Sequence, residues 1–154
     1  MSFEKSFGAV IFRRENRKIY YLLLHYSSVG KEGKDYWDFP KGHPEKGEGE
    51  TETIKREVAE ETGLKDIGFA AGFKEWIKYF FQLEGKRVFK IVTYYLAESK
   101  TSEVKISLEH LGFQWLTFEE ALGQLSFKNS KEILEKANNF LQNSSYRGQT
   151  PIWE

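Results

Sequence analysis

Three glutamates in the middle of the chain, Glu57, Glu60 and Glu61, have the residue type and spacing to do chemistry. On an α-helix their side chains fall within an arc of about 100°, and the like charges of the i, i+4 pair repel at a cost of about 0.2 to 0.5 kcal/mol. Segment 45–61 holds seven glutamates and three cations, a net charge of −4. Such a cluster predicts a site for a hard divalent cation, which takes oxygen ligands and bridges to phosphate. The alternative is a solvated helix face on which Arg56 pairs locally.

The spacing of the whole segment decides between these alternatives. Residues 42–64 read GHPEKGEGETETIKREVAEETGL and fit the Nudix box, G-x5-E-x7-R-E-U-x-E-E-x-G-U with U a bulky aliphatic residue. The specified positions are Gly42, Glu48, Arg56, Glu57, Val58, Glu60, Glu61, Gly63 and Leu64. A complete match at fixed spacing is very improbable by chance. The chain therefore resembles the Nudix hydrolases, which use a divalent metal to cleave a nucleoside diphosphate linked to another group.

The resemblance implies a role for each charged residue of the box. Glu57, Glu60 and Glu61 would bind Mg²⁺ or Mn²⁺, and Glu57 is also a candidate general base for the attacking water. Metal ions on the phosphates would stabilise the charge of the leaving group and make a bound water more acidic. Arg56 would orient a box carboxylate through a charge-assisted hydrogen bond.

The remaining box residues are expected to shape the loop around the helix. Glu48 would brace this loop or hold an outer metal. Gly42 and Gly63 would permit the tight turns at either end, because glycine tolerates backbone conformations that other residues avoid.

Beyond the box, residues 7–142 resemble the asymmetrical diadenosine tetraphosphate hydrolases. The matching pieces include FGAVIFRR, YLLLHY, WDFPKGH, SLEHLGFQWL and LSFK. That branch places a further catalytic and metal-binding carboxylate in the SLEH segment, which implies this role for Glu109. Glu57 and Glu109 are both candidates to take the proton from water. The alternative for Glu109 is a surface-loop residue, and the neighbouring His110 is expected to be a structural hydrogen-bonding residue.

The same resemblance implies a substrate site. Lys41 and Lys90 match phosphate-binding lysines of the branch, and their mobile point charges suit a chain of phosphates. Tyr79 and Phe127 are the candidates to stack on adenine, since an aromatic ring stacks on any base; packing within the protein is the competing interpretation for both. Tyr36 precedes the tryptophan where animal members carry histidine, and would take over any phosphate contact of that histidine.

Length and composition limit the other possibilities. A chain of 154 residues predicts one domain, expected over 1–142, with a C-terminal tail at 143–154. The lack of cysteine excludes disulfides and thiolate chemistry, and 23 basic against 23 acidic residues argue against a stable nucleic-acid partner. No run approaches the roughly 18 to 20 apolar residues of a membrane span. We therefore expect a cytoplasmic monomer that meets no membrane and acts on a small molecule. Lys86 and Arg87 at the hairpin tip are expected to be solvated; the alternative is that they add to the positive field that attracts phosphate.

The elements that must position these residues follow from hydrophobic periodicity. Alternating and aromatic runs predict strands at 7–12, 18–26, 67–73, 76–83, 87–97 and 113–116. Segment 50–62 has a helical pattern, segment 39–49 is too rich in glycine and proline for regular structure, and two helices follow the last strand. This order predicts an α+β fold. The resemblance implies an α/β/α sandwich, a Nudix fold with a central mixed sheet, the box helix on one side and a C-terminal helix on the other.

The expected function is metal-dependent hydrolysis of diadenosine tetraphosphate to ATP and AMP by attack of water at phosphorus. Related substrates are the nearest alternative: longer dinucleoside polyphosphates, RNA 5′ ends or nucleoside triphosphates. A nucleotide-binding sensor without catalysis is the alternative from another class, and the complete box argues against it.

Overall fold

The computed structural model describes residues 2–28, 34–143 and 152–153. Along the chain its elements are β1 (Ser2–Glu15), β2 (Lys18–Tyr26), β3 (Tyr36–Asp38), β4 (Lys41–Gly42), α1 (Glu50–Thr62), β5 (Ile67–Leu83), β6 (Lys86–Ser99), β7 (His110–Leu116), α2 (Phe118–Gln124), α3 (Lys128–Gln142) and β8 (Ile152–Trp153). The strands form one sheet in the order β3-β2-β1-β6-β5-β8, with β4 pairing β1 and β7 pairing β2. The sheet is mixed because β1 and β6 run parallel, whereas the other pairs are antiparallel.

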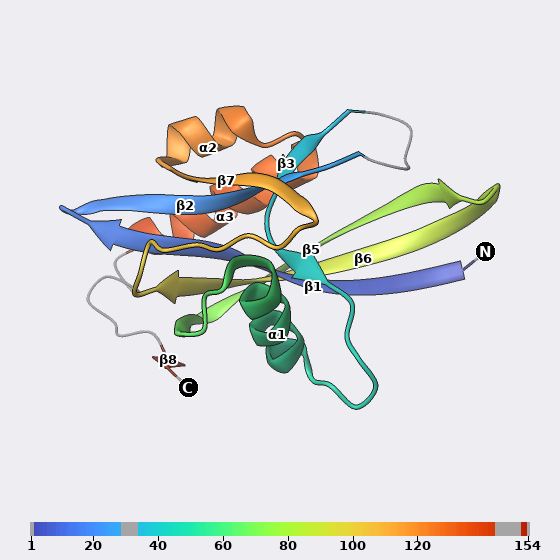
Figure 1. Cartoon of the computed structure of the whole chain (residues 1–154), viewed down its shortest axis with the longest axis horizontal. Helices are drawn as coiled ribbons and strands as arrows, with labels where there is room; N and C mark the ends of the chain where they lie inside the picture. The colour runs from blue at the N-terminus through green and yellow to red at the C-terminus, as the bar shows by residue number, and fades with distance from the viewer. Residues whose placement is uncertain (1, 29–33, 144–151, 154) are drawn as a thin grey trace.

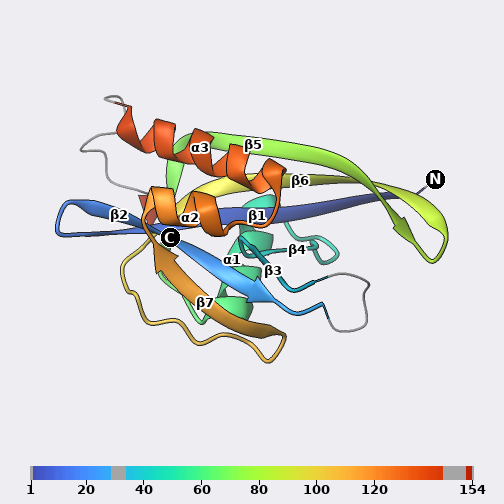
Figure 2. The same ribbon diagram turned by 90° about the horizontal axis from the view of Figure 1, so that it is seen from above.

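Alternation along the central strand β1 creates a core on each face of the sheet. Phe7, Ala9 and Ile11 face the core that holds α1, and Val10 and Phe12 face the core of α2 and α3. The helices contribute matching apolar residues: Ile54 and Val58 from α1, and Ile133, Leu134, Ala137 and Leu141 from α3. Figure 1 shows α1 below the sheet and α2 above it, and Figure 2, seen from above, shows α2 and α3 in front of the strands. The predicted sandwich is thus confirmed.

The predicted bounds of several strands were wrong, β6 and β7 being longer than the expected 87–97 and 113–116. The strands expected at 67–73 and 76–83 form one strand, β5, which absorbs a register shift between Phe69 and Lys74 through a bulge containing Gly72 at φ 95°. Segment 39–49 was expected to be irregular throughout, yet its residues Lys41 and Gly42 form β4. Local composition misses β4 because its pairing partner, Phe7–Gly8 of β1, lies far away in sequence.

A long ribbon extends the sheet beyond its helices. The polar start of β1 continues to pair with β6 from Ser2 onward, so β1 is longer than the predicted 7–12. The predicted turn at Glu84-Gly85 is present, with φ of 51° and 75° as a tight hairpin requires. In both Figure 1 and Figure 2 the end of the β5–β6 hairpin and the start of β1 project past the helices.

Much of the expected C-terminal tail, residues 144–151 and 154, lies outside the described residues. Within that tail, β8 pairs antiparallel with Gly68 and Phe69 of β5. None of the described helices is long and apolar enough to cross a membrane.

Candidate active site

Helix α1 carries the charged box residues from Arg56 to Glu61 and packs against β1 and β4. Ile54 and Val58 are almost fully buried against the sheet and fix the rotation of the helix about its axis. Gly63 ends the helix as predicted, in the left-handed conformation at φ 75°, and its N–H donates to the carbonyl of Ala59.

Arg56 ties the loop before α1 to the helix. Its Nε and Nη2 donate to the two carboxylate oxygens of Glu48 at 2.7 and 2.9 Å, a bidentate pair. Nη1 donates to Oε1 of Glu57 at 2.7 Å, and Nη2 also donates to the carbonyl of His43 at 2.8 Å. Arg56 therefore has the geometry to orient Glu57, and Glu48 lies where it can brace the loop.

The bonds that Glu48 accepts favour its charged form. The guanidinium of Arg56, the backbone N–H of Glu45 and the hydroxyl of Thr53 all donate to it, and together they lower its pKa to about 2. Because the folded pKa is depressed, the stabilisation is present above the unfolded value and is lost as the pH falls towards 2. We expect Glu48→Gln to flatten the loss of stability between about pH 4.5 and 2, measured by urea unfolding at each pH; an unchanged pH profile would contradict this role.

A cleft of about 560 Å³ opens between the C-terminal half of α1, β4 and the start of β7. Its charged lining includes the carboxylates of Glu57, Glu61 and Glu109 and the ammonium groups of Lys41 and Lys90. These five residues, predicted as metal- or phosphate-binding from separate parts of the sequence, therefore come together.

Glu60 does not line this cleft. Its side chain is 59% exposed, and its carboxylate lies 3.5 Å from Nη1 of Arg56. The geometry of α1 explains the difference, because Glu57 and Glu61 are almost in line along the helix whereas Glu60 is turned about 100° from Glu61.

Two residues that sequence reasoning did not assign to the site lie against Glu61. The hydroxyl of Tyr26 is 2.9 Å from the carbonyl oxygen of Phe39 and 3.3 Å from Oε2 of Glu61, so its one proton is shared between these two acceptors. Nε2 of the buried His110 lies 3.4 Å from the same oxygen of Glu61. Nδ1 of His110 is 2.9 Å from the hydroxyl of Ser107, which fits the structural role expected for this histidine. Tyr26 ends a predicted strand, so its place beside the box could not be inferred from local pattern.

The carboxylates of the cleft suit a divalent cation. Burial raises the pKa of Glu57; the guanidinium of Arg56 opposes this effect, and the nearby Glu61 carboxylate adds to it. A cation between these carboxylates would relieve their repulsion. Among the described residues no three acidic or histidine side chains converge into a complete metal site. Hard divalent cations take oxygen ligands and can complete their shell with water, so a partial set of carboxylates is compatible with such an ion.

The close approach of Gly42 to the helix offers a direct test of the cleft. A Cβ at position 42 would overlap the carboxyl group of Glu57. We expect Gly42→Ala to displace this carboxylate. With the general-base role expected for Glu57, the displacement should lower kcat about 10²-fold or more, because misplacing a reacting group by about 1 Å has that effect. Steady-state kinetics beside urea unfolding check the prediction. The Gly47→Ala control changes the same loop, where a Cβ meets nothing within 4 Å but strains a φ of 80°. Equal activity of Gly42→Ala and wild type would contradict the prediction.

A second cavity of about 290 Å³ adjoins the cleft. Its lining is mostly apolar and combines Tyr79, Phe127 and Ile77 with the polar residues Asp38, Lys41, Asn129 and Ser130. Lys41 lines both spaces and is held by Asp38, with Nζ 3.1 Å from Oδ2. Burial alone would lower the pKa of Lys41, but the carboxylate of Asp38 raises it overall, so the ammonium stays charged.

Aromatic rings also connect the two spaces. Tyr36 lines the cleft, stacks on Tyr26 with ring centroids 5.0 Å apart, and lies 5.3 Å from the ring of Phe127. Phe127 is 46% exposed and precedes α3, so a large part of its ring surface is free to meet a ligand. The structure thus brings together every predicted substrate-binding residue around the cleft or this cavity.

The sandwich, the complete box and the carboxylate cleft define a class of protein, and the chain belongs to the NUDIX domain family, whose model matches residues 2–137. Within the family it is similar to the asymmetrical bis(5′-nucleosyl)-tetraphosphatase of Mus musculus, at 36% identity over 87% of this chain and 92% of that protein. The corresponding protein of Caenorhabditis elegans is 30% identical over 89% of this chain and 96% of its own length. A solved binary complex of a C. elegans Ap4A hydrolase superposes with a TM-score of 0.76 at 30% identity, covering 90% of this chain and 98% of that one. The predicted resemblance to this branch is confirmed.

Proposed function

We propose that the protein is an asymmetrical diadenosine tetraphosphate hydrolase that forms ATP and AMP. The proposal rests on the position of Lys41, which lines both the carboxylate cleft and the aromatic cavity and so connects them. A nucleotide whose base stacks in the cavity would lead its phosphates past Lys41 to Glu57 and Glu61. The relatives from Mus musculus and C. elegans are named as asymmetrical bis(5′-nucleosyl)-tetraphosphatases, and they match this chain over most of its length.

The charged residues of the cleft suggest how the reaction would be divided among them. Lys41 and Lys90 bind phosphate oxygens as point charges. A divalent cation, which we propose to be Mg²⁺ or Mn²⁺, would be held by Glu57 and Glu61, and would neutralise phosphate charge and acidify a bound water. Glu57, oriented by Arg56, accepts the proton of the attacking water. Glu109 lines the same cleft, so it is the alternative base or a further ligand.

Substrate preference tests the proposal. We expect diadenosine tetraphosphate, with Mg²⁺, to give the highest kcat/KM in a panel with longer diadenosine polyphosphates, ATP and RNA carrying a 5′ triphosphate. The aromatic cavity is less open than the cleft and mostly apolar, which favours a nucleoside there at one end of the substrate, whereas the more open and charged cleft accepts the polyphosphate. Faster turnover of any other member would replace the proposed substrate, and tight binding without turnover would indicate a sensor.

The aromatic cavity gives a second test. We expect Tyr79→Ala and Phe127→Ala each to raise the Kd for non-hydrolysable diadenosine tetraphosphate about 5- to 100-fold, because base stacking contributes about 1 to 3 kcal/mol per ring. Isothermal titration checks this, with Phe80→Ala, an exposed ring on the opposite face of the same strand, as control. An unchanged Kd in both cavity variants would place the adenine elsewhere.

The proposal includes a monomer that acts in the cytoplasm. The cleft and the cavity are both built within one chain, which supports the monomer as the active unit. Light scattering at the assay concentration tests the oligomeric state.

A further inference from the structure

The projecting end of the sheet carries aromatic and basic side chains in rows across its strands. In one row Phe3, Phe89 and Phe80 are neighbours, with ring centroids 5.7 and 4.9 Å apart. Side chains of a strand alternate between its two faces, so Phe3 lies on the same face as Phe7, four residues further along β1. Phe7 packs in the core beneath α1, and the row therefore points to the face that holds this helix. Phe3 and Phe80 are 54% and 48% exposed, so the row is an open platform rather than a core.

Cations lie on both sides of this aromatic row. On one side the side chains of Lys5 and Lys78 flank Ile91. On the other, the guanidinium of Arg87 lies over the ring of Phe80, 4.0 Å from its centroid. Among the described residues of these three rows there is no aspartate or glutamate. We call this surface, together with the 58% exposed Trp76 of the next row, the ribbon face.

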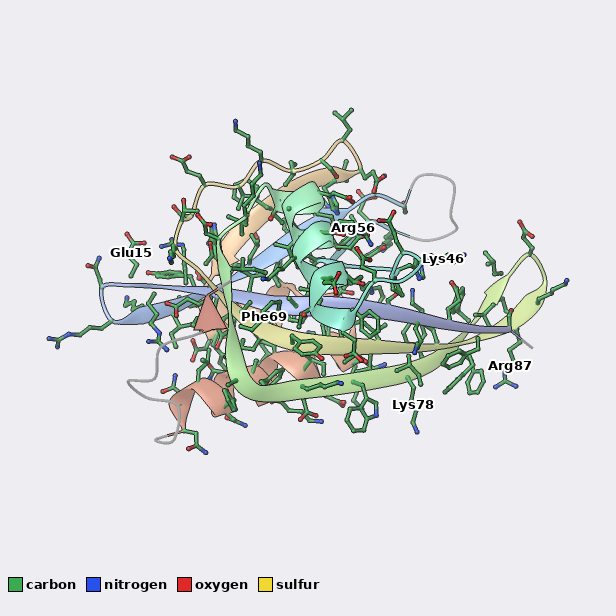
Figure 3. The ribbon with its side chains drawn as sticks, turned by 90° about the horizontal axis from the view of Figure 1, so that it is seen from below. Glu15, Lys46, Arg56, Phe69, Lys78 and Arg87 are labelled. Atoms are coloured by element: carbon green, nitrogen blue, oxygen red, sulfur yellow. The ribbon has the colours of Figure 1, made fainter. Side chains whose placement is uncertain are left out.

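The ribbon face lies beside the cleft but outside it. Figure 3 shows Lys78 and Arg87 on the projecting ribbon, to one side of α1. The two surfaces meet at Lys5, whose side chain belongs to the ribbon face while its carbonyl is 3.0 Å from Nδ1 of His43 in the lining of the cleft. A polymer on the ribbon face could therefore reach the cleft along the edge of β1.

The chemistry of the ribbon face selects among possible occupants. Interfaces between protein copies are depleted of lysine at their centres, and a symmetric dimer through this face would bring cations of both copies together. Exposed rings interleaved with cations are instead the pattern that binds single-stranded nucleic acids, by stacking of bases and pairing with phosphates. We propose that the ribbon face docks a single-stranded nucleic acid. This inference goes beyond the proposed function and does not depend on it.

Binding of a fluorescent oligouridylate of about twelve nucleotides, followed by anisotropy, tests the proposal on the full chain. We expect wild type to bind the single strand more tightly than a duplex of equal length. Phe80→Ala should weaken binding about 5- to 100-fold through the loss of one stacked base. Lys78→Gln and Arg87→Gln together should reduce the salt slope of log K by about 1.4, since each phosphate contact on a single strand contributes about 0.7.

Controls separate this surface from the active site and from general charge effects. Lys65→Gln removes an exposed cation in the segment after α1 and should leave both affinity and salt slope unchanged. Hydrolysis of diadenosine tetraphosphate should be equal in Phe80→Ala and wild type, because Phe80 lines neither the cleft nor the cavity. The proposal is overturned if wild type does not bind the oligonucleotide at low salt, or if Phe80→Ala binds it as well as wild type. The proposal would also be overturned if the wild-type protein formed dimers that Phe80→Ala dissociates. Tighter binding of the wild-type protein to anionic vesicles than to RNA would overturn it as well.

Discussion

Replacing Glu57 with glutamine should lower kcat for diadenosine tetraphosphate by about 10²- to 10⁴-fold. Glutamine keeps the size of the side chain but cannot accept the proton of water, and it removes a negative charge from a cleft built around carboxylates. The 2.7 Å charged contact with Arg56 is weakened at the same time. Single-turnover kinetics with saturating Mg²⁺ measure the effect on the chemical step.

A matched substitution on the same helix is the control for Glu57→Gln. Glu52 lies in the exposed first turn of α1, and Glu52→Gln should keep kcat within about twofold of wild type, since surface substitutions away from a site have small effects.

Measuring substrate affinity together with turnover separates an enzyme from a nucleotide-binding sensor. A Glu57→Gln variant with unchanged turnover would contradict the proposed base, and a wild type that binds the nucleotide without turning it over would point to a sensor.

Replacing Asp38 with alanine should destabilise the protein by about 3 to 5 kcal/mol. The side chain of Asp38 is only 2% exposed and holds the ammonium group of Lys41 at 3.1 Å. Its Oδ1 also accepts hydrogen bonds from the hydroxyl of Ser130 and the backbone N–H of Phe39, both at 2.8 Å. Alanine would leave both donors without an acceptor, and it would leave the mostly buried ammonium group of Lys41 without a counter-charge. Urea unfolding gives the free energy, and a loss below about 1 kcal/mol would contradict the account of this pair.

An exposed ion pair provides the comparison for Asp38. Glu75 accepts from Lys136 at 3.1 Å on the surface, and Glu75→Ala should cost no more than about 1 kcal/mol. Asp38→Asn separates charge from shape, because the amide can keep the hydrogen bonds of its oxygen while losing the ion pair. We expect its stability to lie between those of Asp38→Ala and wild type, with a raised Kd for the nucleotide because Lys41 is no longer fixed between cleft and cavity.

The parts of the fold and site that sequence predicts best depend on local spacing. The run from Glu50 to Gly63 predicts α1 with its C-cap, and the positions of Glu48 and Arg56 within the box lead to the bidentate contact. Local spacing also predicts the hairpin at Glu84-Gly85.

The parts that sequence reasoning missed depend on pairing between distant segments. The positions of Tyr26 and His110 beside Glu61 arise only when β2 pairs with β7. Lys5 and Lys78 are far apart in sequence and join one row only through β6. A balanced net charge therefore concealed a local basic surface, since net charge does not report how charges are distributed on the folded sheet.

Hydrolysis in ¹⁸O-labelled water shows whether the protein splits its substrate asymmetrically by attack of water at a phosphorus. The protein is incubated with Mg²⁺ and diadenosine tetraphosphate, and the separated products are weighed by mass spectrometry. We predict ATP and AMP in equal amounts, with the label in only one of them, which also identifies the attacked phosphorus. Two molecules of ADP, or no turnover, would contradict the proposed function.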